Sequence, residues 1–329
     1  MPRLVSLALA LLLMQTAAQA ADATSTTVIP QAAIEKAGEL RERALKDDVA
    51  YAIVADLTTE IGPRLAGGEN DLKAREWMVA RFKSLGFDKV WSEPVSYPKW
   101  VRRSESAAIV SPFPQSLAVT ALGGSAATPT GGLDAEVIAF DSLDAMKAAA
   151  DYQVKGKIVY LAIPRMHALS DGHDYGTGSA VRVRGPELAA AKGASAFLLR
   201  SVGSDGNRLA HTGMTRFTDP AKAIPAAALS NPDAALLDNV LKRGQPVKLR
   251  LALDCGIEGS YNGANVIAEI TGSSRPNEYF LSGGHLDSWD LGTGAIDDGA
   301  GVAISMAAGH LIGALPKVQR PERTIRVIA

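Results

Sequence analysis

The segment from Phe280 to Gly301 gathers most of the side chains that could do chemistry. It reads FLSGGHLDSWDLGTGAIDDGAG, an apolar run followed by a histidine, four aspartates and several glycines. His285 and Asp297 lie twelve positions apart, and Asp287 comes two residues after the histidine. A histidine nitrogen and a carboxylate oxygen are ligands that zinc accepts, and a carboxylate can also bridge two metal ions. The segment therefore predicts a metal site with His285 and Asp297 as ligands.

The other aspartates around this pair have different expected roles. Residues i and i+2 of an extended chain point to the same side, so Asp287 could hold the second nitrogen of His285. Metal-bound histidines usually have such a partner. Asp290 and Asp298 are predicted to be helix caps or turn formers. Without a metal, the same residues would form only a hydrogen-bonded turn, and the sequence leaves that alternative open.

Two other kinds of site do not fit the pattern. The glycines around Gly294 follow neither the G-x-G-x-x-G spacing of dinucleotide-binding loops nor the G-x-x-x-x-G-K-[ST] spacing of phosphate-binding loops. Ser288 does not lie in the G-x-S-x-G turn that is typical of serine hydrolases. The predicted chemistry is therefore that of a metal site.

Strands and helices are predicted to alternate around this segment. Residues 262–272 and 278–285 have the apolar and β-branched composition of strands. A helix is predicted over 297–315 and a further strand over 323–329. This alternation predicts an α/β fold with a mixed, mainly parallel sheet and flanking helices. Ligands of such sheets bind beyond the carboxyl ends of the strands, and His285 would follow a buried strand at that place.

The N-terminal part of the chain is predicted to belong to the same domain. Residues 30–57 have the spacing of one long helix, and a second helix starts near residue 70 and stops at Gly86. Residues 89–122 form short β-like runs with prolines between them. The glycine-rich stretch from 123 to 132 then predicts a domain boundary.

Residues 133–254 are predicted to form an inserted α/β domain. Apolar strands alternate there with two helices, one over 185–194 and one that begins at Asn231 with Pro232 in its first turn. The polar stretch 165–179 is predicted to be a solvated loop, with a second metal site around its histidines as the alternative. Three more side chains have modest predicted roles: Arg182 and Arg184 would line one face of a strand, and His211 would lie in a loop, with a place in the active cleft as the alternative.

The first twenty residues predict a secretory signal peptide. Arg3 is followed by a short apolar run over residues 4–14 and by the small residues Ala18 and Ala20. The run is shorter than the roughly 20 apolar residues that span a bilayer, and no other segment approaches that length. An uncleaved anchor is the alternative. The mature chain is therefore expected to be secreted or periplasmic, without a transmembrane segment.

The composition adds limits of its own. The net charge is 34 − 35 = −1, which gives no indication of nucleic acid or an anionic membrane as a partner. Cys255 is the only cysteine, so neither a disulfide within the chain nor a four-cysteine zinc site can form. The last residues, 323–329, resemble a strand that enters a sheet, and we therefore expect the sequence to be an N-terminal fragment.

The predicted organisation has four parts. They are a signal peptide over 1–20, the N-terminal part of the main domain over 21–132, the inserted domain over 133–254, and the remainder of the main domain over 255–329.

Residues 283–301 closely resemble the metal-binding segment of the two-zinc exopeptidases of the aminopeptidase and glutamate carboxypeptidase type. They are most similar to the plasma glutamate carboxypeptidase branch of that family. The sequence IGPRLAGG at 61–68 is similar to the N-terminal region of these enzymes, and residues 133–254 look like their protease-associated domain. The resemblance thus extends over nearly all of the mature chain.

The resemblance implies a role for each residue of the segment. His285 would ligate one zinc, Asp297 would bridge two, and Asp287 would be the acidic residue that supports the catalytic centre. A cis peptide bond without proline would join Asp297 to Asp298. The general base and three further zinc ligands would follow Ala329, so the printed chain should be inactive alone.

The activity that the resemblance implies is a secreted, zinc-dependent exopeptidase, of carboxypeptidase or dipeptidase type. Two zinc ions would activate water to hydrolyse a short peptide or dipeptide, with no nucleic acid as a partner and a homodimer as one allowed assembly. An aminopeptidase of the same family and a non-catalytic binding protein of the same fold are the alternatives. His285 and Asp297 are residue types that bind zinc, so they argue against the non-catalytic binding protein.

Overall fold

The computed structural model describes residues 28–329, which fall into two compact units divided after Asp48. The described part of the first unit holds one helix, α2 (Gln31–Ala44), none of whose residues is buried. The predicted signal peptide, residues 1–20, lies outside the described residues.

The second unit begins with α3 (Val49–Asp56), which continues into a π-helical turn over Leu57–Ile61. The prediction of one continuous helix over 30–57 is therefore wrong. The helix breaks at Asp47 and Asp48. Aspartate side chains compete for neighbouring backbone groups, and they therefore favour helix ends over helix interiors.

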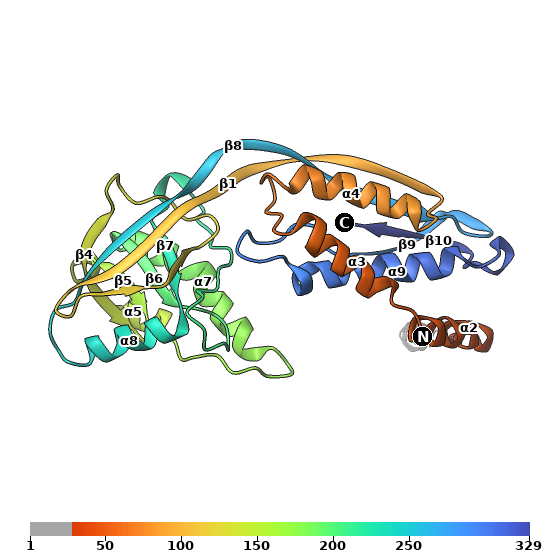
Figure 1. Ribbon diagram of the computed structural model, residues 1–329. Coiled ribbons are helices and arrows are strands. Elements are labelled where there is room, and N and C mark those ends of the chain that lie inside the picture. Colours follow the sequence, from red (N-terminus) through yellow and green to blue (C-terminus); the bar gives the residue numbers. More distant parts are fainter. Residues whose placement is uncertain (1–27) are drawn as a thin grey trace, which may run out of the picture. The chain divides into compact units, whose positions relative to one another are not determined.

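Two strands of 23 residues each form the longest pairing of the second unit (Figure 1). β1 (Lys89–Ser111) and β8 (Lys248–Ile270) run antiparallel, from Lys89 opposite Glu269 to Ser111 opposite Lys248. We call residues 112–247, which connect the two strands, the inserted lobe.

The length of these strands corrects the sequence prediction. The prediction of short runs is wrong over 89–111, which form one strand, whereas Gln115–Leu117 and Val119–Ala121 are short strands. The strand predicted over 262–272 is the last part of β8. Pro94 and Pro98 fit inside β1 because, among the described residues, this part of the strand pairs only with β8. No partner strand within residues 28–329 lies along its other edge, so no backbone N–H donor is needed there. Proline, which lacks this donor, is therefore tolerated.

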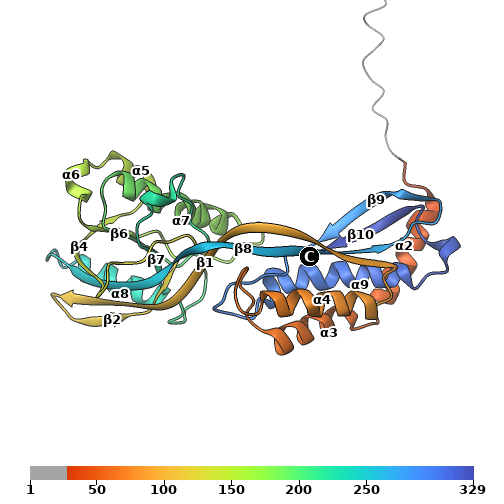
Figure 2. The same ribbon diagram turned by 90° about the horizontal axis from the view of Figure 1, so that it is seen from above.

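The helices of the main domain pack beside β8 (Figure 2). α4 (Asp71–Ser84) and α9 (Gly301–Gly313) lie next to α3 and β8, and their apolar side chains share one core. The strand β10 (Arg323–Ile328) pairs antiparallel with β8 and parallel with β9 (Arg275–Gly283). The core contains the following buried residues from these elements: Ile53, Leu57, Met78, Phe82, Val266, Ile270, Val302, Met306 and Val327.

The prediction that a buried strand precedes His285 is wrong for the described residues. β9 pairs only with β10 there, so it forms an edge of the sheet. Its side chains are mostly exposed, including those of Tyr279, Phe280 and Leu281.

The inserted lobe contains four parallel strands. β4 (Leu133–Phe140), β5 (Ile158–Leu161), β6 (Ala196–Arg200) and β7 (Ala226–Leu229) lie in this order, and β4 also pairs antiparallel with β8. Helices flank this part of the sheet. The remaining elements of the lobe are β2 (Gln115–Leu117), β3 (Val119–Ala121), α5 (Leu143–Ala148), α6 (Asp151–Val154), α7 (His173–Ala191) and α8 (Asn231–Leu241).

The helix α7 overturns two predictions. It begins at His173, twelve residues before the predicted start, so the polar stretch 165–179 is only partly a loop. Arg182 and Arg184 lie on this helix and not on a strand. The buried positions of α7 follow a helical period, which the sequence hides because most of them are small: Gly178, Arg182, Gly185, Pro186 and Ala189.

The helix α8 matches its prediction to within one residue. Ser230 is the N-cap, and its hydroxyl accepts a hydrogen bond from the backbone N–H of Asp233. Pro232 lies in the first turn, as predicted.

Two further predictions concern the chain as a whole. The boundaries at residues 132 and 254 stay predictions, and β8 continues through the second one without a break. Within residues 28–329, no helix has the length and apolar character needed to cross a bilayer.

Candidate metal centre

The structure brings His285, Asp287 and Asp297 together beyond the end of β9. The imidazole Nε2 of His285 lies 2.9 Å from Oδ1 of Asp297. Its Nδ1 lies 2.9 Å from the backbone carbonyl oxygen of Asp287 and 3.2 Å from Oδ1 of the same residue. The two ring nitrogens therefore have separate partners, one on each side of the imidazole. The roles of these residues as ligands and catalytic group stay predictions.

Two glycines allow the chain to fold this closely. A Cβ atom at Gly283 would lie 2.1 Å from the carbonyl oxygen of Ile328, and one at Gly284 would lie 2.3 Å from Oδ2 of Asp298. Only glycine avoids both overlaps. The backbone therefore approaches closely at the end of β9.

The charges around His285 favour its protonated form in the absence of a metal. Burial alone would lower the pKa of the imidazole. The hydrogen bond to the Asp287 carbonyl and the carboxylates of Asp287 and Asp297 outweigh burial, so the pKa of His285 lies above its ordinary value.

These donors fit a metal ion of the zinc type. Asp287 holds Nδ1 of His285, which leaves Nε2 and the Asp297 carboxylate as the ligands. Two ligands are fewer than the three or four that zinc sites in proteins use. Within residues 28–329, no group of three or more histidine, cysteine or acidic side chains is arranged to hold a metal.

The turn after Asp297 has the geometry that the resemblance implies. The Asp297–Asp298 peptide bond is cis. The Asp298 carboxylate accepts hydrogen bonds from the backbone N–H groups of His285, at 3.2 Å, and Gly301, at 3.1 Å. Asp298 thus caps the start of α9, as predicted.

A buried arginine that the sequence prediction missed lies beneath the metal segment. Arg64 is 1% exposed, and its guanidinium donates to the carbonyl oxygens of Leu286, Thr293 and Gly294. Burial lowers the pKa of Arg64, and the nearby Asp287 carboxylate acts in the opposite direction. The only signal in the sequence is its place in IGPRLAGG, next to Pro63 in a short loop.

A second buried arginine pairs with Asp290 of the metal segment. The side chain of Arg102 is 5% exposed, and its guanidinium binds both carboxylate oxygens of Asp290, at 2.9 and 3.2 Å. It also donates to the carbonyl oxygen of Ala121 and to Thr212 of the inserted lobe. Asp290 lies in a turn, which is one of its two predicted roles, and its carboxylate is also the ion-pair partner of a strand residue distant in sequence.

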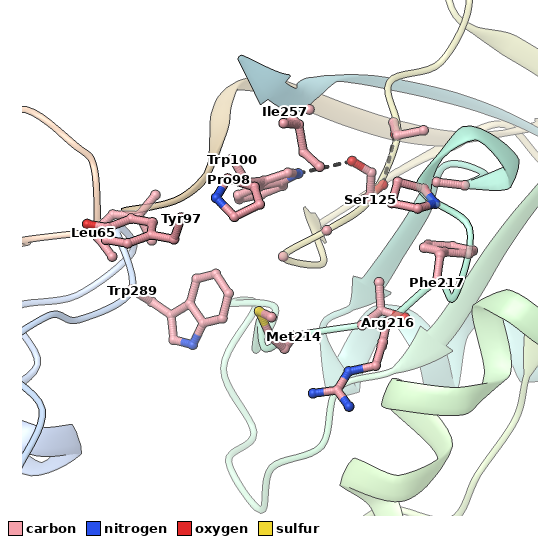
Figure 3. A pocket seen from close by; sticks show the side chains of 18 of the residues that line it. Leu65, Tyr97, Pro98, Trp100, Ser125, Met214, Arg216, Phe217, Ile257 and Trp289 are labelled. Carbon is pink, nitrogen blue, oxygen red and sulfur yellow. Dashed lines mark hydrogen bonds between the residues drawn. The ribbon is translucent and has the colours of Figure 1, made fainter. Parts of the chain in front are cut away.

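The three residues His285, Asp287 and Asp297 line a cavity of about 880 Å³. Figure 3 shows this cavity with Trp100, Met214, Phe217, Ile257 and Trp289 among the apolar side chains that line it. The indole N–H of Trp100 donates to the carbonyl oxygen of Ser125 at 3.0 Å. The cavity thus combines an apolar wall with the acidic residues of the candidate metal centre.

Arg216 is the only lysine or arginine among the described residues that line this cavity. It extends from the inserted lobe, and its side chain is exposed (Figure 3). A guanidinium in this position gives the cavity a positive group besides the acidic ones.

The histidines of the inserted lobe differ in their surroundings. The ring of His211 packs edge-on against Tyr175, with the ring centroids 6.5 Å apart. Burial and the charge of Arg182 lower the pKa of His211, and the Asp297 carboxylate acts in the opposite direction. His211 lies in a loop, as predicted, and it is not among the described residues that line the cavity.

The other histidines have local partners. His167 Nδ1 lies 3.3 Å from Asp174, and the backbone N–H of His173 donates to Asp171, so the structure does not assemble the alternative second metal site. His310 on α9 bonds to the carbonyl oxygen of Leu85 through Nδ1, at 2.8 Å, and so has a structural partner.

The chain is similar to known peptidases in sequence and in fold. Residues 265–329 match the family model described as Peptidase family M28. Carboxypeptidase Q of Homo sapiens is 36% identical over 279 residues, which make up 85% of this chain and 57% of that protein. Carboxypeptidase Q of Rattus norvegicus is 37% identical over the same shares. The chain therefore spans little more than half the length of these curated relatives.

Solved structures show the same fold. A peptidase M28 precursor from Shewanella amazonensis is 49% identical, with a TM-score of 0.85, over 89% of this chain and 66% of that one. An aminopeptidase from Aneurinibacillus is 20% identical with a TM-score of 0.57, over 85% of this chain and 61% of that one. The predicted α/β fold with a mixed sheet and flanking helices is confirmed.

Proposed function

We propose that this chain supplies the substrate cavity and part of the metal centre of a zinc-dependent exopeptidase. The premise is its similarity in sequence and fold to peptidase family M28. One observation carries this proposal. His285, Asp287 and Asp297 lie together at an apolar cavity that is large enough for a short peptide. Ligand pockets are typically apolar with a few convergent polar groups, and this cavity has that composition.

The chemistry follows from the donors. When bound, zinc would supply a Lewis acid that lowers the pKa of water and polarises a peptide carbonyl. Nε2 of His285 and the Asp297 carboxylate would hold it, and Asp287 would fix the imidazole by accepting the proton on Nδ1. Trp289 and Trp100 would keep bulk water from the reacting bond.

Several finer points belong to the same proposal. Two zinc ions with Asp297 between them, and further ligands and a glutamate base outside the printed sequence, would complete the centre. The signal-like residues 1–20 would direct the protein out of the cytoplasm, which N-terminal sequencing of the mature protein would test.

The cavity favours a substrate with a free carboxyl end. Arg216 can pair with a terminal carboxylate, because guanidinium groups bind carboxylates through two parallel hydrogen bonds. The name carboxypeptidase Q, given to relatives at 36% identity, agrees with this direction. An aminopeptidase activity is the other outcome of the test below.

The test uses the full-length natural protein and two blocked dipeptides. One has an acetylated amine and a free carboxylate, and the other has a free amine and an amidated carboxyl end. We expect zinc-dependent hydrolysis of the first substrate, and hydrolysis of the second alone would indicate an aminopeptidase. Fewer than one bound zinc per chain, with neither substrate cleaved, would instead support a non-catalytic binding protein.

A further inference from the structure

The loop that carries the candidate metal ligands has little apolar packing of its own. We call residues 284–298 the metal loop. Within it, only Leu286 and Ser288 are buried. Apolar burial therefore cannot fix the spacing of His285 and Asp297, which lie near the two ends of the loop. Polar contacts do so instead, both within the loop, where Asp298 accepts from the backbone N–H of His285, and from outside it.

Arg64 contacts the metal loop near both ends. Its Nε lies 2.5 Å from the carbonyl oxygen of Leu286, directly after His285. The two terminal nitrogens of its guanidinium donate to Thr293 and Gly294, four and three residues before Asp297, the latter at 3.0 Å. One rigid group therefore joins the two ends of the loop.

The backbone of Arg64 adds a second connection. Its N–H donates to Oγ of Ser288, and its carbonyl oxygen accepts from the N–H of Ser288, both at 3.1 Å. No acidic side chain bonds to the buried guanidinium in the described part of the chain. The guanidinium donates instead to four backbone carbonyl oxygens. Three of them belong to the metal loop and one to Gly62.

We propose that Arg64 is a positioning residue of the metal centre, which sets the spacing of His285 and Asp297 by binding the metal loop at both ends. This inference rests on the proposed function for the identity of the ligands. The planar guanidinium presents its donors in a fixed fork, so the two ends of the loop cannot move apart without breaking hydrogen bonds. Lysine keeps the charge but has a compact ammonium group that cannot reproduce the fork.

Arg200 provides a matched control in the inserted lobe. Its side chain is 9% exposed, and it donates to the carbonyl oxygens of Ile163 and Asn231, at 3.0 and 3.2 Å, and to Asp238. Arg200→Lys therefore also places a lysine ammonium group among backbone carbonyls, but away from the metal loop. A general loss of stability would affect both variants.

The first experiment is hydrogen–deuterium exchange on the metal-free mature chain, with Arg64→Lys and Arg200→Lys. We expect the amides of residues 286–299 to exchange about tenfold faster or more in Arg64→Lys, because hydrogen bonds from a charged donor are lost. Arg200→Lys should leave these amides unchanged. Equal exchange of residues 286–299 in Arg64→Lys and the wild type would overturn the inference. If Arg64→Lys does not fold, Arg64→Gln takes its place with the same expectations.

The second experiment measures, by equilibrium dialysis, the zinc affinity of the full-length natural protein and of its Arg64→Lys and Arg200→Lys variants. We expect Arg64→Lys to bind zinc about tenfold to a hundredfold more weakly, as is typical when a group that orients a ligand is lost. Arg200→Lys should bind as the wild type does. Faster exchange without a change in zinc affinity would reduce Arg64 to a structural role and overturn the inference. A wild type that binds no zinc would contradict the proposed function instead, and the exchange result would still decide whether Arg64 holds the loop.

Discussion

The inserted lobe and the metal loop are stabilised by different forces. In the lobe, β5, β6 and β7 are fully buried. Consecutive residues such as Ile158 and Val159 point to opposite faces and belong to two separate apolar clusters. The metal loop follows the exposed strand β9 and is held by Arg64 and Arg102 through backbone carbonyls and one carboxylate. The lobe thus depends on burial, whereas the loop depends on a few polar contacts between residues far apart in the sequence.

The largest expected effect tests the apolar side of this comparison. Phe197 in β6 is fully buried, whereas Phe280 in β9 is 63% exposed. Phe197→Ala should lower the free energy of unfolding by about 3–5 kcal/mol, because it removes apolar contacts and leaves a cavity. Phe280→Ala should change it by no more than about 0.5 kcal/mol. Urea unfolding of the mature chain gives both values, and similar losses would show that β9 is as well packed as β6.

A smaller effect is expected where the two regions meet. A Cβ atom at Gly123 of the inserted lobe would lie 2.3 Å from Cη2 of Trp289 in the metal loop. Gly123→Ala should displace the indole, which changes its fluorescence and costs about 1–3 kcal/mol of unfolding free energy.

Gly176 provides the control for this substitution. It lies in α7, and a Cβ atom there would meet nothing within 4 Å. Gly176→Ala should leave the fluorescence unchanged and stabilise the helix by about 0.5–1 kcal/mol. Unaltered fluorescence in Gly123→Ala would mean that Trp289 does not contact the lobe in solution.

The smallest effects concern two histidines, one from each region. The pKa of His285 is raised in the folded protein, so its proton stabilises the fold. This stabilisation is fully present below the unfolded-state pKa and is lost as the pH rises through the folded-state pKa. In the metal-free protein, the stability difference between wild type and His285→Gln should therefore shrink as the pH rises.

His211 should behave in the opposite way. Its pKa is lowered in the folded protein, so protonation opposes folding. The penalty is absent above the unfolded-state pKa and grows as the pH falls toward the folded-state pKa. His211→Gln should therefore lose less stability than the wild type on acidification. Unfolding curves across this pH range test both signs, and parallel profiles for the two variants would contradict them.

Local patterns predicted much of the fold but not its longest strands. α8 follows from Pro232 and the apolar residues after it, because these signals are close in sequence. β1 could not be recognised as one strand, since Pro94 and Pro98 are acceptable only on a strand edge without a partner, which depends on the tertiary fold. α7 was hidden for a related reason, because its buried face consists mostly of glycine, alanine and proline.

The candidate site shows the same division. His285, Asp287 and Asp297 could be selected from one short segment, because their types and spacing are local properties. Arg64 and Arg102 could not, because their partners lie 222–230 and 188 positions away in the sequence. Contacts of this kind leave no periodic signal in the residues that make them.

Zinc binding to the full-length natural protein tests the central claim, that His285 and Asp297 hold a metal ion, most directly. Equilibrium dialysis compares the wild type with His285→Ala, Asp297→Asn and a control, Asp134→Asn, whose carboxylate pairs with Arg250 in the inserted lobe. We predict zinc binding that either ligand substitution abolishes and that the control retains. Zinc binding that is equally strong in all four proteins, or absent from the wild type, would contradict the account.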